Sequence, residues 1–203
     1  FSAGIRPQDT LARQCGLAIG ERGGIVIDNR CTTSDPHIHA IGECALWNQK
    51  IFGLVAPGYT MARTLSAALN GDADAAFTGA DMSTKLKLLG VDVGSIGDAH
   101  GQSPGARSIR FVDEQRGHYR RMVVSPDGKK LLGAILVGDN SRYDTLLQYA
   151  LNGIDLPDTP EALILPESQG GAPVLGADAL PETAAICSCH NVTKGDICGV
   201  IDD

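Results

Sequence analysis

The most constraining feature of this 203-residue sequence is a turn between two strand-like runs. Residues 118–124 and 131–137 are rich in apolar and β-branched side chains, and Ser125-Pro126-Asp127-Gly128 stands between them. A proline followed by Asp-Gly is strong turn chemistry, because proline presets φ and glycine adopts positive φ without strain. The pattern predicts a β-hairpin, and therefore an antiparallel sheet in this part of the chain.

Further elements complete this module. Residues 91–96 and 108–113 alternate between apolar and polar side chains, which is typical of strands. Asp139-Asn140-Ser141 can cap a helix. Its predicted apolar face consists of Leu146, Leu147, Ala150 and Leu151. Residues 82–155 are therefore predicted to form an α+β module with a mainly antiparallel sheet and a closing helix.

Residues 1–80 have a different pattern and are rich in glycine and alanine. Residues 24–28 are a short run of β-branched side chains and predict one strand, and residues 38–42 predict another. A helix is expected through residues 58–69, where apolar side chains recur at helical spacing. The first part of the chain is therefore predicted to be α/β.

The last fifty residues are acidic and rich in proline. Residues 155–184 hold five of the ten prolines, and from Tyr143 through Thr193 there are seven acids and no lysine or arginine. We expect an extended connector over 156–185, in which the apolar run 162–165 docks on a neighbouring element. Residues 186–203 begin a separate segment.

Composition excludes several classes of function. Lys plus Arg number 17 against 24 Asp plus Glu, giving a net charge of −7, which argues against nucleic-acid and anionic-membrane surfaces. No apolar run is long enough to span a membrane. The six cysteines are unevenly spaced, so we expect a reducing, cytoplasmic compartment. Because the chain starts at Phe1 without a methionine or signal peptide, we expect an internal fragment of a longer protein.

Glu43 is the first candidate functional residue. It follows Gly42 at the end of the second predicted strand, and in open α/β sheets ligands bind at the carboxyl ends of strands. Glycine permits close approach, and a carboxylate accepts hydrogen bonds from sugar-like hydroxyls. Residues 55–58 then open a helix whose N-terminal amides can face an electron-rich ring edge. The same pattern also suits a strand, a turn and a helix with no ligand.

A second candidate site is Cys187-Ser188-Cys189. Thiolates bind iron, and a [2Fe–2S] cluster normally takes four of them, so two cysteines can serve one iron. Spacing alone does not separate such ligands from coincidence. A basic group around the predicted hairpin suits either a solvated sheet face or a docking surface for an acidic partner. It consists of Arg116, Arg120, Arg121, Lys129 and Lys130.

Several stretches together carry a family resemblance. Residues 4–7, 23–28 and 33–44 resemble the last FAD-contacting part of the pyridine-nucleotide disulfide reductase-like flavoproteins. The most specific stretch is Gly42-Glu43-Cys44-Ala45 followed by residues 52–59. Over essentially all its residues, the chain is similar to the large subunits of the NAD(P)H-dependent siroheme nitrite reductases.

The resemblance implies a domain organisation. Residues 1–80 correspond to the end of a Rossmann-like FAD/NAD(P)-binding domain, and 82–155 resemble the C-terminal domain of NADH–rubredoxin reductases. Residues 156–185 would be the linker. Residues 186–203 resemble the start of a bacterioferritin-associated-ferredoxin-like [2Fe–2S] module, with Cys187 and Cys189 as its first two ligands.

The resemblance also implies cofactor contacts. Gly42 and Glu43 would approach the flavin ribityl chain, whereas the wider flavoprotein class usually has Asp at the position of Glu43. The residues that would lie by the pyrimidine edge of the flavin are Ala56, Pro57 and Gly58, and those that would flank the dinucleotide are Gly4 and Arg6. No residue of this chain is expected to be catalytic.

The implied parent enzyme passes electrons from NAD(P)H through FAD and iron–sulfur centres, including a [4Fe–4S] cluster, to siroheme, where nitrite becomes ammonium. A small subunit is its expected partner. The chain has no Gly-x-Gly-x-x-Gly, so we expect it alone neither to hold FAD firmly nor to oxidise NADH. One alternative is a reductase of rubredoxin or the flavoprotein of an assimilatory nitrate reductase. Another is a non-enzymatic dimer or subunit interface formed by residues 82–153.

Overall fold

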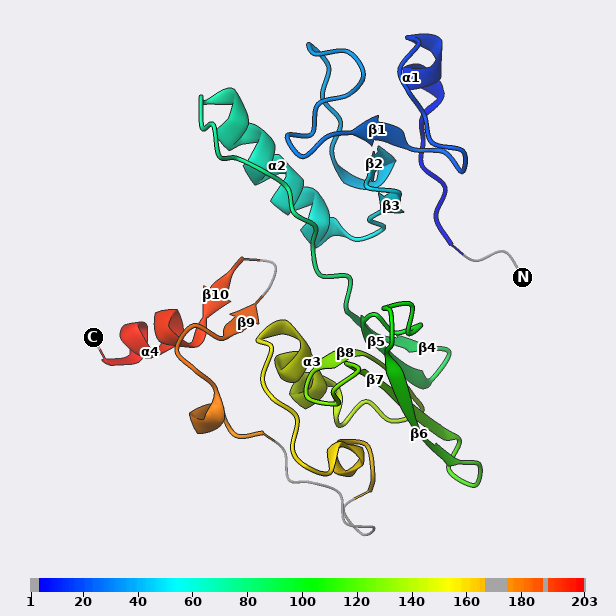
Figure 1. Cartoon of the computed structure of the whole chain (residues 1–203), viewed down its shortest axis with the longest axis vertical. Helices are drawn as coiled ribbons and strands as arrows, with labels where there is room; N and C mark the ends of the chain where they lie inside the picture. Colours follow the sequence, from blue (N-terminus) through cyan, green and yellow to red (C-terminus); the bar gives the residue numbers. More distant parts are fainter. Residues whose placement is uncertain (1–3, 167–174, 188–189, 203) are drawn as a thin grey trace. The chain divides into compact units, whose positions relative to one another are not determined.

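The computed structural model describes residues 4–166, 175–187 and 190–202. These residues belong to two compact units, Phe1–Met82 and Ser83–Asp203 (Figure 1). Each unit has its own buried apolar cluster. The two units are therefore described separately.

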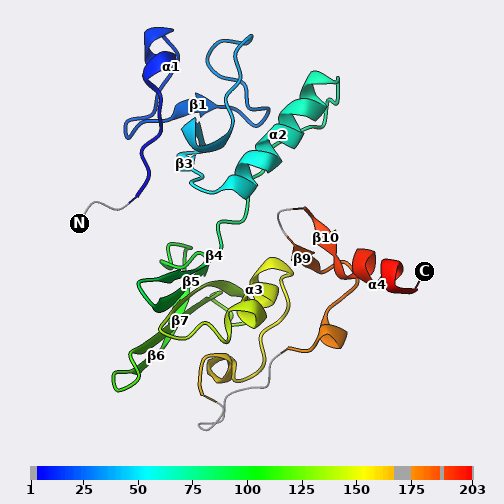
Figure 2. The ribbon, with the colours of Figure 1, turned by 180° about the vertical axis from the view of Figure 1, so that it is seen from behind.

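The first unit combines a small sheet with helices. Its elements are α1 (Thr10–Gln14), β1 (Ile25–Ile27), the 3₁₀ turn η1 (Gly42–Cys44), β2 (Ala45–Trp47), β3 (Lys50–Ile51) and α2 (Val55–Leu69). The sheet order is β1-β2-β3, with β1 parallel to β2 and β2 antiparallel to β3. Asn48 and Gln49 form the β2–β3 turn, and both have positive φ, as a tight two-residue hairpin requires. Figure 2 shows this small sheet and α2 from behind.

Three aromatic rings form the centre of the first unit. The ring centroid of Phe77 lies 5.1 Å from that of Trp47 and 5.5 Å from that of Phe52, both edge to face. Met61 and Cys31 are completely buried in the same cluster. Phe77 follows α2 in the chain, and its amide donates to the Asn29 carbonyl, so the segment after the helix returns to the core.

The strand predicted over residues 38–42 does not form. His39 makes only an isolated bridge with Thr32, and the strand of this region is β2, three residues after Gly42. The Ile38 amide donates to the Asp35 carbonyl in a turn, and Gly42 has a φ of 77°, which ends any extended run. Glu43 therefore lies in a turn that enters a strand, and the prediction that it follows a strand was wrong.

The second unit contains a five-stranded sheet with a helix packed on it. Its main elements are β4 (Thr84–Leu88), β5 (Val91–Gly97), β6 (Arg107–Asp113), β7 (His118–Val124), β8 (Leu131–Val137) and α3 (Tyr143–Leu151). The strand order is β4-β5-β8-β7-β6, and every neighbouring pair is antiparallel. The predicted hairpin is the β7–β8 pair. An α/β part followed by an α+β part is thus confirmed as the fold class.

The helix α3 covers the sheet with a face that differs slightly from the predicted one. Leu146 is completely buried as predicted, but its buried companions are Tyr143 and Tyr149. The side chain of Asp139 accepts a 2.8 Å hydrogen bond from the Ser141 amide just before the helix. The apolar face therefore runs along positions three residues apart, and aromatic rings supply much of its area.

Arg120 is buried, so neither interpretation of its basic group, a solvated face or a docking surface, holds for this residue. The residue is 4% exposed, and its guanidinium pairs with Asp139 and donates a 2.7 Å hydrogen bond to the Ile164 carbonyl. Ile164 and Leu163 are themselves buried against the sheet and α3. Arg120 thereby ties the 3₁₀ turn η2 (Pro160–Leu163) and its apolar run to the sheet.

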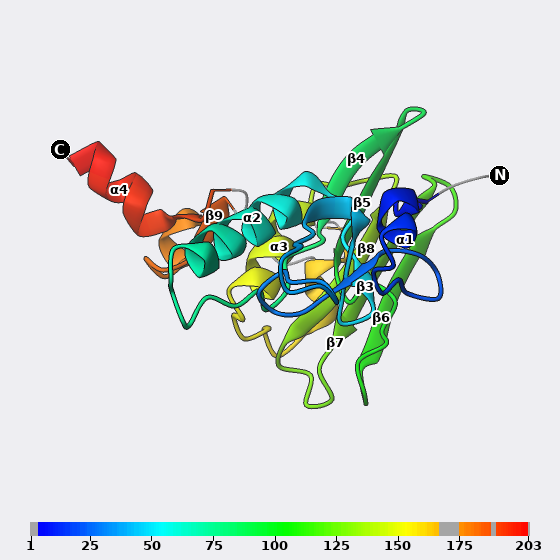
Figure 3. The ribbon, with the colours of Figure 1, turned by 90° about the horizontal axis from the view of Figure 1, so that it is seen from above.

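The described end of the chain contains short elements. These are η4 (Ala177–Ala179), β9 (Ala185–Cys187), β10 (Val192–Thr193) and α4 (Lys194–Asp202), the last seen at the C-terminal end in Figure 3. The Ala185 amide donates a 2.9 Å hydrogen bond to Asn152 Oδ1 at the end of α3. Within the described ranges, no helix has the length and apolar character needed to cross a membrane.

Candidate functional site

The predicted Gly42-Glu43 pair forms the first half of the site. Gly42 has a φ of 77°, and a Cβ atom at this position would meet no atom within 4 Å. The space beside Gly42 is therefore open, and the left-handed backbone is the reason for a glycine here. Glu43 follows in the first turn of η1 with an exposed side chain, so its carboxylate can reach a ligand over the glycine.

The first turn of α2 forms the second half. The helix begins at Val55, so Ala56, Pro57 and Gly58 all lie in its first turn, and Pro57 fits there because its missing N–H would have no helical partner. That turn has no acidic residue and no side-chain cap. Its backbone amides thus present positive potential without a carboxylate to neutralise it.

The two halves are in contact through their glycines. A Cβ atom on Gly58 would lie 3.5 Å from the Cα atom of Gly42, so the backbone of η1 passes directly over the first turn of α2. Gly42, Glu43 and residues 56–58 are therefore brought together, although Gly42 and Gly58 are sixteen positions apart in sequence. The backbone next to Glu43 therefore lies against the first turn of α2, whose own residues include no acid.

Met61 contacts this junction on its buried side. It is completely buried, and its sulfur lies 3.3 Å from the backbone nitrogen of Gly42, which donates a hydrogen bond to it. The helical spacing of Met61 predicted a core residue, and the contact with Gly42 was not foreseen. Pro57 and Met61 are four residues apart and both buried, which places them on the same face of α2.

Apolar side chains surround the junction on the exposed side. Val55 is 69% exposed and Tyr59 is 56% exposed, and their spacing of four residues puts them on one face of α2. Ile41, next to Gly42, is 37% exposed. A surface that combines exposed apolar groups with a carboxylate and free amides suits a ligand with a flat ring and a polyol chain.

Gly4 and Arg6 are less closely tied to this junction. Gly4 has a φ of 114° and open space at its Cβ position, and Arg6 is exposed. Among the described residues, no hydrogen bond or ion pair links Arg6 to another side chain. Between them, the Ile5 side chain fills the space beside Gly53, which anchors this segment close to the start of α2.

The candidate metal ligands are only partly described. Cys187 ends β9 as a half-buried free thiol and pairs with Val192 of β10. Cys189 lies outside the described residues. Within the described ranges, no group of three or more His, Cys, Asp or Glu residues could hold a metal ion.

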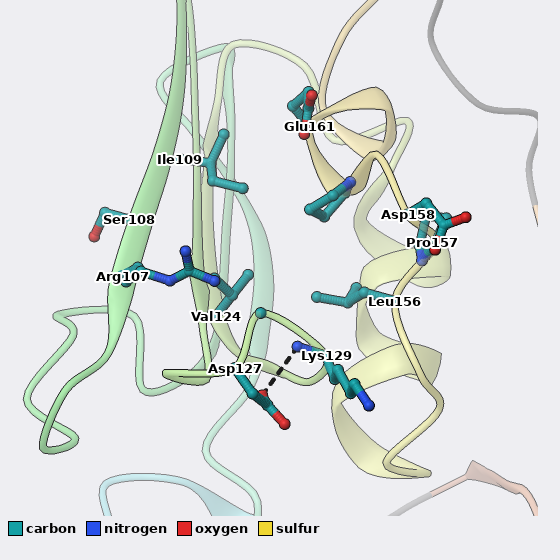
Figure 4. A pocket seen from close by; sticks show the side chains of 12 residues that line it. Arg107, Ser108, Ile109, Val124, Asp127, Lys129, Leu156, Pro157, Asp158 and Glu161 are labelled. Carbon is teal, nitrogen blue, oxygen red and sulfur yellow. Dashed lines mark hydrogen bonds between the residues drawn. The ribbon is translucent and has the colours of Figure 1, made fainter.

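A pocket of about 570 Å³ in the second unit contains none of the predicted flavin or cluster residues, although Lys129 of the basic group lines it. In Figure 4, Arg107 of β6 and Leu156 extend into it from opposite walls, with Asp158 and Glu161 near its rim. Lys129 donates its backbone N–H to Asp127 at 3.1 Å on the hairpin turn. Charges of both signs line this pocket, so its lining favours no single class of ion.

Comparison with known proteins adds to this geometry. Residues 1–68 match the pyridine nucleotide-disulphide oxidoreductase family, and residues 83–154 match the rubredoxin NAD+ reductase C-terminal domain family. The chain is 62% identical over 202 residues to the nitrite reductase [NAD(P)H] large subunit of Klebsiella oxytoca, covering 99% of this chain and 21% of that protein. Over almost its whole length, the chain is thus similar to part of an NAD(P)H nitrite reductase large subunit.

Two more comparisons show how much of each related protein this chain covers. The nitrite reductase (NADH) large subunit of Escherichia coli K12 is 59% identical over 203 residues, covering all of this chain and 24% of that protein. This chain thus spans about a fifth to a quarter of the length of these relatives. A FAD-dependent pyridine nucleotide-disulphide oxidoreductase from Desulfovibrio vulgaris superposes with a TM-score of 0.54 and 28% identity, covering 73% of this chain and 40% of its own.

Proposed function

We propose that residues 1–80 form the flavin-flanking end of a FAD-binding domain in an NAD(P)H-dependent nitrite reductase. The observation that carries the proposal is the junction where Gly42 and Glu43 meet the first turn of α2. When bound, FAD would take electrons from NAD(P)H in a pair and release them one at a time. The residues of this chain would bind and orient that cofactor.

The residues present fit such a cofactor. The open space beside Gly42 admits the chain of a polyol, and Glu43 can accept hydrogen bonds from its hydroxyls. The amides at the first turn of α2 suit the electron-rich edge of a ring, because that turn contains no carboxylate. Gly4 and Arg6 would flank the dinucleotide, since Arg6 is exposed and carries a charge that phosphate oxygens bind.

The flavin proposal can be tested in a complete large subunit that contains this segment. Replacing Glu43 by Ala removes the carboxylate, and we expect flavin affinity to fall about tenfold, as for the loss of one charge-assisted hydrogen bond. Glu43→Gln retains one acceptor oxygen and should lose less. The dissociation constant is measured by flavin fluorescence during titration of the apoprotein.

A matched control separates a local contact from a general loss of charge. Glu114 is an exposed carboxylate outside the first unit, and Glu114→Ala should leave the flavin dissociation constant unchanged. Equal affinities for wild type, Glu43→Ala and Glu114→Ala would refute the role of Glu43.

We further propose that Cys187 and Cys189 provide two thiolates of a [2Fe–2S] cluster, with the other ligands outside this chain. Cys187 is a free thiol at the end of a strand, which leaves it able to bind iron. Cys187→Ser in the complete subunit should remove the visible absorbance of this cluster while retaining that of flavin. A spectrum identical to wild type would count against this ligand.

The parent activity follows from these parts. We propose that residues 82–155 form an interface domain, that 156–185 connect it to the cluster module at 186–203, and that electrons continue through a [4Fe–4S] cluster to siroheme. There nitrite would be reduced to ammonium, with a small subunit as partner. The free thiols of the described cysteines suit a reducing compartment such as the cytoplasm.

A further inference from the structure

Met61 packs under the α2–η1 junction, although it is not one of the proposed flavin contacts. Its side chain lies on the buried side of the α2–η1 junction and is 0% exposed, so it cannot touch a ligand on the outer side. Its sulfur nevertheless accepts the hydrogen bond of Gly42, the residue next to Glu43. Met61 is therefore placed to act on the site through the backbone.

The orientation of the Gly42 peptide matters for two reasons. A residue with φ of 77° lies in the left-handed region, where the N–H and the following carbonyl point differently from those of a strand residue. Gly42 also starts η1, and the first amides of such a turn have no partner within the turn. Fixing the Gly42 amide to a buried acceptor on α2 fixes the direction in which the next residue leaves the turn.

The Met61 sulfur also links α2 to η1, the two elements that form the site. Met61 stands one turn after Pro57 on α2, and the backbone of Gly42 rests against Gly58 of the same helix. The carbonyl of Met61 accepts a 3.8 Å hydrogen bond from the buried Cys31 thiol, which ties this turn of the helix to the core. Helix, turn and core are thus linked through one residue.

We propose that Met61 is a positioning residue of the flavin site, whose thioether orients the Gly42-Glu43 turn against the first turn of α2. This inference rests on the proposed flavin function of the junction. Methionine suits the task because its unbranched side chain fills the core while its sulfur is a weak acceptor. A leucine would fill a similar volume but leave the half-buried Gly42 amide without its acceptor.

The test is Met61→Leu in the complete flavin-loaded large subunit. We expect the unfolding midpoint to stay close to that of wild type, because the substitution conserves volume. We expect the flavin dissociation constant to rise roughly threefold to tenfold, the range for one lost hydrogen bond, and the flavin midpoint potential to shift. A purely structural role would not move the potential.

The matched control is Met122→Leu. Met122 is also 0% exposed, but it belongs to the core of the second unit. This variant should leave the flavin affinity and potential at their wild-type values. If Met61→Leu and Met122→Leu both behave as wild type while Glu43→Ala weakens flavin binding, the positioning role is refuted and the flavin site stands.

Other combinations of results would test the flavin site itself. If Glu43→Ala and Met61→Leu both leave flavin affinity and potential unchanged, the flavin proposal fails and the Met61 role fails with it. Met61→Leu could instead lower the free energy of unfolding by as much as it lowers the free energy of flavin binding, and leave the flavin potential unchanged. In that case Met61 is a packing residue only. Met61→Gln, which restores an acceptor oxygen, should recover part of the lost affinity if orientation is the cause.

Discussion

Cys31 illustrates how burial sets the chemistry of a single residue. Its side chain is completely buried in the first unit, and burial, helped by the charge of Asp28, raises the pKa of its thiol to about 11. The reactive thiolate is therefore scarce at neutral pH. Cys15, by contrast, is exposed at the end of α1.

We expect the two cysteines to react at different rates. With iodoacetamide at pH 7.5, mass spectrometry should find Cys15 alkylated while Cys31 stays free, and urea should make both react. Because the pKa of Cys31 is raised in the folded state, stability should fall as pH rises above the ordinary thiol value of 9.0. Native Cys31 labelled as fast as Cys15 would contradict this account.

The Asp139 carboxylate gives a second prediction at the same scale. Partial burial acts to raise its pKa, but hydrogen bonds from Ser141 and the Arg120 guanidinium outweigh that effect and hold the pKa below its usual value of 3.8. Its contribution to stability is full above that value and is lost as pH falls through the folded-state pKa. Asp139→Asn should cost about 2 kcal/mol at pH 7.

Urea denaturation at several pH values tests this. The stability difference between wild type and Asp139→Asn should shrink as pH drops from 5 towards 2. Asp158→Asn, at an exposed carboxylate, should match wild type throughout. A difference that is constant with pH would show that the carboxylate charge contributes nothing.

At the scale of elements, the sequence predicted those whose signals are local. The Pro-Asp-Gly turn specified the β7–β8 hairpin, and the alternating runs specified β5 and β6. The strand β4 was missed, although its Thr-Lys-Leu-Lys-Leu pattern alternates. The predicted strand at 38–42 failed because Gly42 adopts a left-handed conformation that hydrophobicity does not reveal.

In the candidate site, too, the sequence indicated the residues with local signals but not the contacts that depend on packing. The sequence pointed to Gly42, Glu43 and residues 56–58 through a local pattern of glycine, acid and helix start, and through a family resemblance. The sulfur contact of Met61 depends on how α2 packs against η1, and no local pattern encodes such packing. Arg120 was expected on an exposed basic surface, either solvated or used for docking, because a charge suggests exposure and the sequence does not show that Asp139 packs beside it.

The attachment of β9 to α3 gives a prediction for elements. Asn152 Oδ1 accepts the Ala185 amide, two residues before Cys187. Asn152→Ala should speed hydrogen exchange of that amide about fivefold, the effect of roughly 1 kcal/mol. Asn70→Ala removes a comparable side-chain bond at the end of α2 and should leave Ala185 unchanged. Unchanged exchange in Asn152→Ala would mean that the bond does not hold the strand.

Along the whole chain, three segments with different features follow one another in sequence. A junction suited to a flavin lies in the first unit, an antiparallel sheet with its helix forms the second, and the Cys187 strand follows the acidic segment. Under the proposed function, these features would share the task of positioning an electron carrier. The decisive quantity is therefore the distance between the Glu43 carboxylate and the bound cofactor.

The most direct measurement is a structure of the complete, flavin-loaded large subunit. We expect the Glu43 carboxylate within hydrogen-bonding distance of a ribityl hydroxyl, with the first turn of α2 facing the flavin ring. A Glu43 carboxylate remote from every bound cofactor would show that the Gly42-Glu43 turn is not part of the flavin site.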